Sequence, residues 1–330
     1  MAISNRRVFY AVYSCAIAAP LGSTTYSAVH GLQSVGLSTK FNLQQYFEVS
    51  QISLYANLED IPDIEVTLSK NLDGYPLLYH IATTGALDPS LVGRSNQRCS
   101  LGLSIYTDTQ QSASGVPLSQ CVCSGLYVSS ISYTINVNGA MTEDLTLVGN
   151  NKTWSTVFTA PTFNNADQPY GSGIQRRQDV VMGLCVFPSD IPGIVSGVNP
   201  VQADGSYAAH IQSVMTSTNL GRTPLYELGW KGAYFRYAEF PVQVTTDIDV
   251  IPSQGDSVQA LELNNNLVNQ TIQVVTHTGT KIWLGNSNKL QGSTWGGANA
   301  GTGGGNATMT YSYLTFNDFT VTDPQDPSGL

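Results

Sequence analysis

The side chains in this sequence that could do chemistry are a short acidic cluster, four histidines, five cysteines and a glycine-rich run. The acidic cluster consists of Glu59, Asp60, Asp63 and Glu65, a set that suggests calcium binding or a pair of catalytic carboxylates. It lacks the D-x-D-x-D-G pattern of a calcium loop, and Pro62 with the alternating residues after it indicates a turn that enters a strand. We interpret the cluster first as a solvated turn, second as a contact between subunits, and third as a metal site.

The histidines and cysteines are too widely spaced to predict a catalytic or metal site. Cys121 and Cys123 lack the second pair of ligands that a tetrahedral zinc site needs. The five cysteines are odd in number, so at least one is unpaired within the chain. Buried thiols in a protein made in the cytoplasm are the favoured interpretation, and a bridge from Cys99 to either Cys121 or Cys123 is the alternative. The histidines include no H-E-x-x-H pattern and are expected to be packed or exposed residues: His30, His80, His210 and His277.

Two further patterns argue against an enzyme. The run GGANAGTGGG at 296–305 is followed by a strand pattern, whereas a phosphate-binding loop continues into Lys-Ser/Thr and a helix. No G-x-S-x-G sequence is present, so the signature of an α/β-hydrolase nucleophile is missing. We therefore predict no catalytic residue, no cofactor and no metal.

The chain has few charged residues, and acidic residues outnumber basic ones. Only 11% of the 330 residues are charged, against about 25% in an average protein, and the formal net charge is −9. The basic residues are scattered, with only Arg6-Arg7 and Arg176-Arg177 adjacent, so the clusters that grip nucleic-acid phosphates are missing. A surface rich in Thr, Ser, Asn, Gln and Gly suits burial against other subunits, because interface cores are depleted in charge.

The N-terminal stretch has some features of a secretory signal, with Arg6-Arg7 before an apolar run and small residues after it. Tyr10, Tyr13 and Ser14 interrupt the apolar run, so we interpret residues 7–19 as a structural segment. No other stretch approaches the 18 apolar residues of a membrane span.

Residues 131–154, ISYTINVNGAMTEDLTLVGNNKTW, predict a long hairpin. Ile131, Tyr133 and Ile135 alternate with polar residues, and Asn138-Gly139 is a strong turn signal. The return run begins with Glu143 and Asp144 and continues with alternating leucines. We expect one dry face, and one wet, lightly acidic face.

The rest of the chain predicts a mainly β fold: an antiparallel barrel-like or sandwich-like core with long hairpins, one or two short helices and elaborated loops. We expect an N-terminal segment at 1–35, one β domain at 36–321 with insertions at about 86–124 and 160–238, and a polar tail at 322–330. Short helices are expected near 208–217 and 224–228. Strands are expected at 41–58 paired with 64–70, at 239–251, in a hairpin at 271–284, and at 307–321.

Four strings spread over residues 52–321 resemble the tail tube proteins of contractile-tailed bacteriophages. They are ISLYANLEDIPDIEVTLSKNLDGYPLLY, NGAMTEDLTLVGNNKTW, GIQRRQDV and TGGGNATMTYSYLTFNDFTV. The resemblance implies a barrel-like core, sixfold rings of identical subunits, and rings stacked into a tube inside a sheath. DNA would pass through the lumen without specific binding. The chain would be made in the host cytoplasm and reside in the phage tail, with sheath, baseplate and neck proteins as further partners.

The resemblance predicts where the acidic residues of the chain would lie in such a tube. Glu143 and Asp144 are candidates to line the lumen, where carboxylates would repel DNA phosphates, although a contact with a neighbouring subunit or the sheath is equally compatible with the pattern. The turn and the glycine-rich run are candidates for contacts between stacked rings, with these residues: Glu59, Asp60, Asp63, Gly301, Gly303 and Gly304.

Two other functions fit the composition. The first is a different virion protein of the neck, baseplate or capsid surface. The second is a carbohydrate-binding β-sandwich, because four tryptophans and 17 tyrosines could stack on sugars. Hollow rods or rings of the purified protein would distinguish the tube from both.

Overall fold

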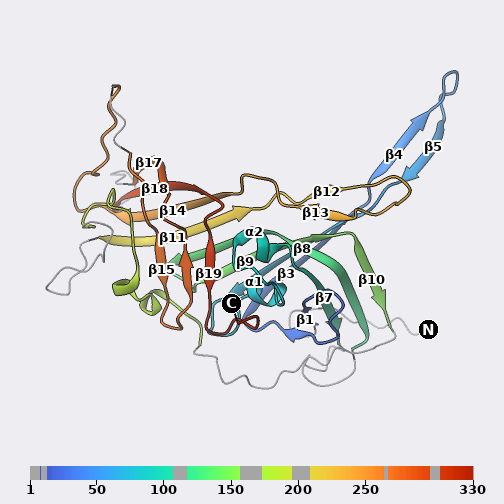
Figure 1. The fold of residues 1–330 in the computed structure, drawn as a ribbon, viewed down its shortest axis with the longest axis horizontal. Coiled ribbons are helices and arrows are strands. Elements are labelled where there is room, and N and C mark those ends of the chain that lie inside the picture. Colours follow the sequence, from blue (N-terminus) through green and yellow to red (C-terminus); the bar gives the residue numbers. More distant parts are fainter. Residues whose placement is uncertain are drawn as a thin grey trace.

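One large antiparallel sheet dominates the computed structural model, which describes residues 8, 13–106, 117–156, 173–194, 209–263, 267–297 and 305–329. Twelve strands belong to this sheet (Figure 1). Its main path crosses eight strands in the order β3 (Leu32–Lys40), β6 (Asp63–Asn71), β9 (Thr142–Gly149), β8 (Ser119–Asn136), β11 (His210–Asn219), β14 (Gln243–Ile251), β18 (Ala307–Phe316) and β17 (Lys289–Gly297).

Strand β8 is the longest and organises the sheet, because it has two different neighbours along each edge. On one edge its first half pairs with β7 (Arg98–Ile105) and its second half with β11. On the other edge its first half pairs with β10 (Asn151–Ser155) and its second half with β9. On the edge shared by β7 and β11, the division falls at Ser129, next to a bulge in the pairing of β8 with β9. The branch beyond β7 continues through β1 (Tyr13–Ala18) to β2 (Ser27–Ala28).

The predicted hairpin at 131–154 is confirmed as β8 and β9. Ile131, Tyr133 and Ile135 are buried and alternate with half-buried polar residues, as expected for a strand with one covered face. Tyr133 lies opposite Glu143 in the register. The connection spans residues 137–141, where the side chain of Asn136 accepts a hydrogen bond from the Asn138 backbone at 3.1 Å.

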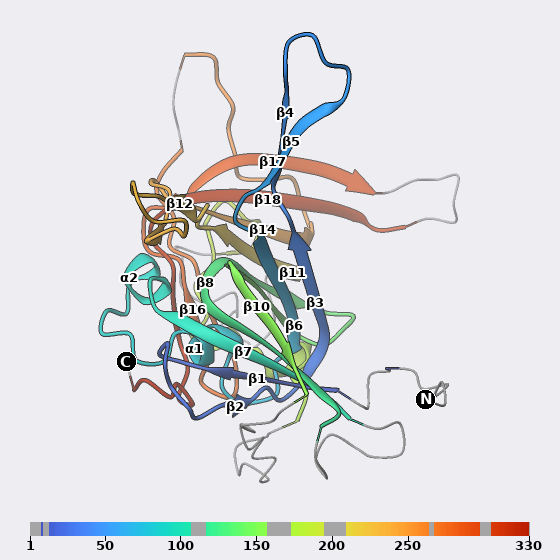
Figure 2. The ribbon, with the colours of Figure 1, turned by 90° about the vertical axis from the view of Figure 1, so that its right-hand side faces the viewer.

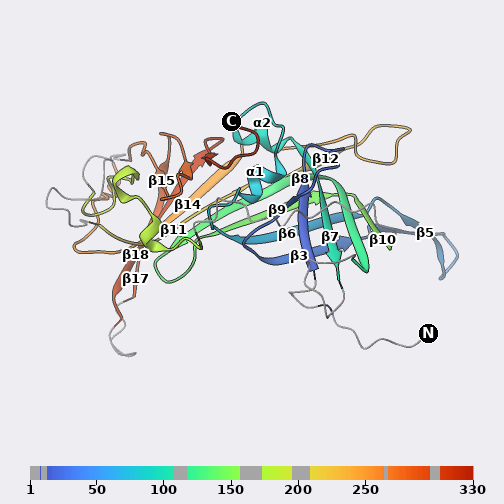
Figure 3. The same cartoon turned by 90° about the horizontal axis from the view of Figure 1, so that it is seen from below.

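Helices and a small sheet cover one face of the large sheet. The helices are α1 (Leu78–Ala82) and α2 (Leu91–Ser95), and both lie on the same side of β8 and β9 in Figure 3. The small sheet contains β15 (Gln273–Val275), β16 (Lys281–Trp283) and β19 (Thr320–Thr322). It joins the large sheet through one continuous apolar core, in which the rings of Tyr133 and Phe319 lie 6.2 Å apart.

Two hairpins extend from the same end of the molecule, at the right in Figure 1 and Figure 3. The first contains β4 (Leu43–Phe47) and β5 (Leu54–Glu59), and the second contains β12 (Thr223–Leu225) and β13 (Phe235–Tyr237). Each pair forms a sheet of its own. Short 3-10 turns at Arg177–Asp179 (η2) and Met182–Leu184 (η3) complete the described elements.

The predicted fold class is confirmed: the described chain is mainly β, its sheets are antiparallel, and it has two short helices. Their predicted places are wrong. The range 208–217 falls largely in β11, because Val214, Thr216 and Thr218 alternate toward the core between two partner strands. The start of the second range falls in β12, which pairs with β13.

The predicted pairing of 41–58 with 64–70 is also wrong. Residues 41–58 fold back on themselves as β4 and β5, with the backbone N–H of Gln51 bonded to the Glu48 carbonyl in the turn at 3.2 Å. Residues 63–71 form β6, which pairs with β3 and β9 instead. The strand at 239–251 and the hairpin at 271–284 are confirmed as β14 and as β15 with β16. The last predicted strand is divided into β18 and β19 at Asn317, whose φ is 62°.

The expected insertions and terminal segments contribute to the described body. The range 86–124 supplies β7 and the beginning of β8, and the range 160–238 supplies β11, β12 and β13. In the N-terminal segment, Ala16 and Ile17 of β1 are fully buried. The polar tail packs against the helices, because Arg94 forms an ion pair with Asp326 at 2.7 Å and both side chains are 3% exposed.

None of the described helices is long and apolar enough to cross a membrane. All five cysteines are buried and carry free thiols.

Candidate functional site

The face of the large sheet opposite the helices is polar and acidic, and we call it the outer face. Its members alternate with core residues along five adjacent strands, β9, β8, β11, β14 and β18, and the strand register places them in rows. One row crosses four strands from Asp144 through Ser132 and Ser217 to Thr245. Two further rows end in acidic residues and their hydroxyl neighbours: Thr134, Met215, Asp247 and Ser312, and Asn136, Ser213, Asp249 and Thr310.

Hydroxyl groups of neighbouring strands hold the β14 carboxylates in place. Asp249 accepts hydrogen bonds from the Ser213 hydroxyl at 2.6 Å and the Thr310 hydroxyl at 2.5 Å. Asp247 accepts one from Ser312 at 2.6 Å. Hydrogen bonds to a charged acceptor are short and strong, so these carboxylates are held in fixed positions, and neither has an ion-pair partner among the described residues.

Basic residues are missing from this part of the sheet. Strands β9, β8, β11, β14 and β18 contain no lysine or arginine at any position. The lysines of the outer strands that share this face, Lys40 on β3 and Lys289 on β17, lie at the two edges of the sheet. The outer face therefore combines three carboxylates with uncharged hydroxyls, a surface that repels phosphate rather than binding it.

A shallow hollow lies over the outer face. It has a volume of about 540 Å³ and is lined by residues of β8, β11 and β14, among them Ser132, Ser217 and Thr245. Met215 adds an apolar side chain to this lining and is 45% exposed. The outer face is thus a broad polar depression without the enclosed shape of a small-molecule site.

The structure corrects the expectation for Glu143, which does not lie on the wet face. Its side chain is 0% exposed, and its carboxylate accepts hydrogen bonds from the backbone N–H groups of Leu78 at 2.6 Å and Tyr79 at 3.0 Å. The hydroxyl of Tyr133 donates a third at 2.8 Å. Residues two apart share a face of a strand, so Glu143 lies with Leu145 and Leu147 in the core. Of the two lumen candidates, only Asp144 lies on the outer face.

Glu143 instead fastens α1 to the sheet. The carboxylate oxygens of Glu143 accept hydrogen bonds from the first N–H groups of that helix, which have no partner within the helix itself. Burial raises the pKa of Glu143, while its hydrogen bonds and the nearby Lys70 act in the opposite direction. Lys70 is itself fully buried, and its ammonium forms an ion pair with Asp73 at 3.0 Å.

The three acidic candidates for ring contacts lie at the base of the β4–β5 hairpin. Glu59 and Asp60 are exposed. Asp63 is partly buried and binds the Arg236 guanidinium at 2.9 Å and the Asn42 side-chain amide at 2.9 Å. Burial would raise the pKa of Asp63, but these two partners bring it below its usual value. Gly301, Gly303 and Gly304 lie outside the described residues.

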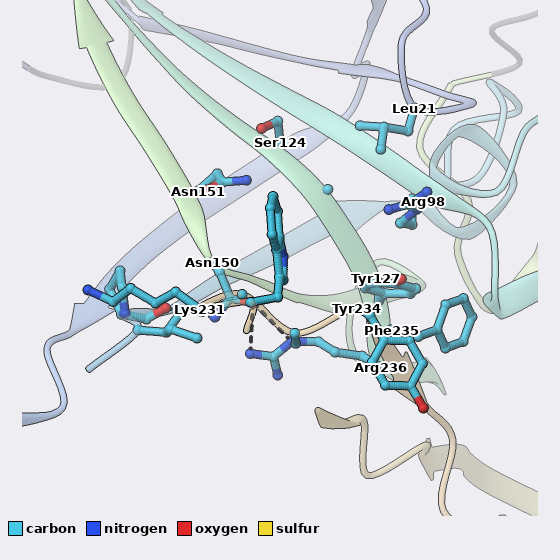
Figure 4. Close-up of a pocket in the computed structure, with 16 residues that line it drawn as sticks. Leu21, Arg98, Ser124, Tyr127, Asn150, Asn151, Lys231, Tyr234, Phe235 and Arg236 are labelled. Carbon is cyan, nitrogen blue, oxygen red and sulfur yellow. Dashed lines mark hydrogen bonds between the residues drawn. The ribbon is translucent and has the colours of Figure 1, made fainter. Parts of the chain in front are cut away.

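A second cavity lies beneath the β12–β13 hairpin and is basic (Figure 4). Its volume is about 570 Å³, and its walls combine the aromatic rings of Tyr127, Trp230, Tyr234 and Phe235 with three basic side chains. These are Arg98 and Lys231, which are exposed, and Arg236, which is buried. None of the lining residues that the structure describes is acidic. We call this cavity the basic pocket; no pattern in the sequence predicts it, because its walls come from six separate parts of the chain.

The described histidines, cysteines and carboxylates form no group of three arranged to hold a metal ion. His80 is buried against the backbone carbonyl of Val321 at 3.1 Å, and burial lowers its pKa to about 4. His30 stacks on Tyr75 with ring centroids 4.2 Å apart. Burial raises the pKa of the Cys15 and Cys99 thiols to about 12, which keeps them protonated and unreactive.

No protein-family model matches this chain, and no curated protein matches it. Part of the chain is similar to several solved structures. A chain of the PVC sheath-tube complex, an extracellular contractile injection system in its extended state, is 9% identical; the match covers 46% of this chain and 94% of that one, with a TM-score of 0.35. A chain of the 6-fold symmetrised baseplate of the anti-feeding prophage is 10% identical, with 47% and 99% covered and a TM-score of 0.35. A chain of the cap that terminates the tube of that prophage is 17% identical, with 48% and 100% covered and a TM-score of 0.32.

Proposed function

We propose that this protein is a non-enzymatic structural subunit of a contractile, phage-tail-like apparatus, and that its copies form stacked, sixfold rings that make up the inner tube. The observation that carries the proposal is the outer face, a hydroxyl-rich and acidic surface that spans five strands without a lysine or arginine. In a ring, this face would line the lumen. Nucleic acid would pass along it with no phosphate-binding group to hold it.

Open sheet edges support self-association. The main path of the sheet ends at β3 on one side and at β17 on the other, and among the described strands each of these pairs with only one neighbour. An unpaired edge presents backbone N–H and C=O groups that another strand can join. Pairing β3 of one copy with β17 of the next would extend the sheet around a ring and leave neither of these two edges free.

The sequence also supports this role, through the four strings that resemble tail tube proteins. In such an apparatus, the surfaces away from the lumen would contact a sheath, and the terminal rings would contact baseplate and neck proteins. The low share of charged residues suits a subunit that is enclosed on several sides.

Electron microscopy of the purified protein tests the proposal directly. Negative staining should show rings or hollow rods, and single particles or fibrous trimers would contradict a tube. Orientation can be tested with Asp144→Cys, because the native cysteines are buried. In assembled rods the new thiol should react with a small maleimide and not with a maleimide coupled to a large protein. Equal reaction with both reagents would place Asp144 outside the lumen.

A further inference from the structure

The β4–β5 hairpin is an apolar arm that the described chain leaves uncovered. It stands away from the body, and its two strands pair only with each other (Figure 2). Val49 and Ile52 at its tip are 92% and 102% exposed. A two-stranded hairpin is marginally stable in water by itself, so a surface of this kind calls for a partner. Nine large apolar residues are exposed along it: Phe41, Leu43, Tyr46, Phe47, Val49, Ile52, Leu54, Tyr55 and Leu58.

The charges of this arm have one sign. Residues 41–62 include Glu48, Glu59 and Asp60 and no lysine or arginine. Glu48 adjoins the exposed tip, so the end of the arm is both apolar and negative. A partner surface that complements it must offer aromatic or aliphatic side chains together with positive charge.

The basic pocket has these properties. Its aromatic rings provide apolar surface, and Arg98 and Lys231 are exposed at it without an ion-pair partner among the described residues. Figure 4 shows both cations beside the pocket, with Arg236 bound to Asn150 within it. In a chain that has 14 basic residues and a net charge of −9, a pocket with two unpaired cations and no acidic residue in its described lining is a specific complement to an acidic arm, while the third cation, Arg236, is already paired with Asp63.

The arm of the same molecule does not reach this pocket. Ile61 and Pro62, at the base of the arm, belong to the pocket wall, and the arm leads away from there. Six strand residues place the tip roughly 20 Å from the base at about 3.3 Å per residue. The occupant must therefore come from another molecule, and the same chain supplies a matching arm.

We propose that the tip of the β4–β5 arm of one copy docks in the basic pocket of a second copy, with Glu48 facing Lys231 and Arg98. The contact joins two different surfaces, so it is head-to-tail and repeats from copy to copy, closing a ring or continuing along a stack. This inference rests on the proposed function and adds to it the pair of surfaces that holds the copies together.

Cross-linking of a mixture tests the contact. Val49→Cys at the tip is prepared in one batch and Ala233→Cys, in the pocket lining, in another. The mixture should give a disulfide-linked dimer under mild oxidation, and neither protein alone should do so, because the native thiols are buried. Leu87→Cys, 95% exposed on the loop between the helices, is the matched control in place of Val49→Cys and should give no dimer with Ala233→Cys.

Charge reversal provides a second measurement. Glu48→Lys and Lys231→Glu should each raise the protein concentration needed for half-assembly by about tenfold or more, and the double variant should return it to within about threefold of the wild type. Rings that form without a Val49–Ala233 cross-link, or charge reversals that change nothing, would overturn the arm-in-pocket contact and leave the proposed tube intact. A wild-type chain that stays monomeric would contradict the proposed function as well.

Discussion

Glu143 shows how one buried carboxylate can join two layers of this molecule. Its three hydrogen bonds link β9, the hydroxyl of Tyr133 on β8 and the first turn of α1. A buried charge is costly unless it is paired or hydrogen-bonded, and here each oxygen has a donor. The residue therefore supports the sheet that carries the outer face, and it acts from the core side.

Removing this acceptor should destabilise the fold. Glu143→Ala leaves two buried N–H groups and a buried hydroxyl unsatisfied, so we expect a loss of about 3–5 kcal/mol in the free energy of unfolding, measured by urea denaturation. Asp144→Ala changes the adjacent residue on the opposite face and should cost no more than about 0.5 kcal/mol. Equal losses for the two variants would contradict the assignment of their faces.

His80 should make stability depend on pH. Its pKa is lowered to about 4 by burial and by the nearby Arg94, so the unfolded chain takes up this proton near pH 6.5 and the folded chain only near pH 4. Stability from this residue is complete above pH 6.5 and decreases as the pH falls, by roughly 3 kcal/mol at pH 4. Burial raises the pKa of Glu143 and of Asp323, which gives the opposite trend.

The comparison of wild type with His80→Gln separates these contributions. The difference in unfolding free energy between the two proteins should shrink as the pH falls from 6.5 to 4, because only the wild type carries the titrating imidazole. A difference that stays constant over this range would show that His80 is not buried in its neutral form.

The face of the strand on which Glu143 lies could be predicted from the local sequence. Period-two alternation from Leu145 and Leu147 already places Glu143 on the core face, whereas its acidic type and the adjacent Asp144 suggested the wet face. The hydrogen bonds from the N–H groups of α1 to the Glu143 carboxylate could not be predicted, because Leu78 and Glu143 are 65 positions apart in the chain. Asp247 and Asp249 of β14 are two positions apart and so share a face of the strand, but their hydroxyl donors come from two other strands and could not be predicted.

The strands whose pattern was clear were predicted well, and the errors arose where pairing is decided by distant partners. Alternation identified β14 and the β8–β9 hairpin, since one face of each is covered and the other is polar. The helix expected at 208–217 is a strand because β8 and β14 lie on both sides of it, a fact that the local sequence does not contain. Residues 41–58 also alternate, but their faces are both exposed, so alternation alone could not reveal a free-standing arm.

The open edge at β17 can be tested with proline. In an edge strand, successive N–H groups point alternately toward the partner strand and toward the free edge. Of Ser293→Pro and Thr294→Pro, one variant loses a bond to β18 and should be less stable by about 1–3 kcal/mol. The other variant loses only an N–H group that points toward the free edge of the sheet.

The variant with near-wild-type stability is the informative one. If copies join through β17, that variant should fold, with an unchanged circular dichroism spectrum, and fail to form closed rings in electron micrographs. Normal rings from the stable variant would mean that the β17 edge is not used for assembly.

The whole molecule combines a positive pocket, a negative arm and a polar acidic face on one chain of net charge −9. Opposite charges are concentrated at the arm and the pocket, where copies would meet, and the outer face keeps a single sign. At physiological salt a charge acts over about 8 Å. DNA in a lumen would therefore be repelled by the charges that line it, and the net charge of the whole subunit would have little effect. With this arrangement, the proposed tube subunit can be acidic without being repelled by its neighbours.

Asp144→Lys tests the lining at the scale of the assembly. The side chain has no ion pair or hydrogen bond to any described residue, so the substitution should leave folding and ring formation unchanged while reversing the charge at every copy along the bore. Tubes of this variant should retain short fluorescent DNA at low salt and release it as salt is raised, because counterion release makes phosphate binding salt-dependent. Wild-type tubes should retain none at either salt concentration. Asp88→Lys makes the same change in net charge on the loop between the helices, on the opposite side of the sheet, and should behave as wild type. Retention by both lysine variants, or by neither, would remove Asp144 from the lumen.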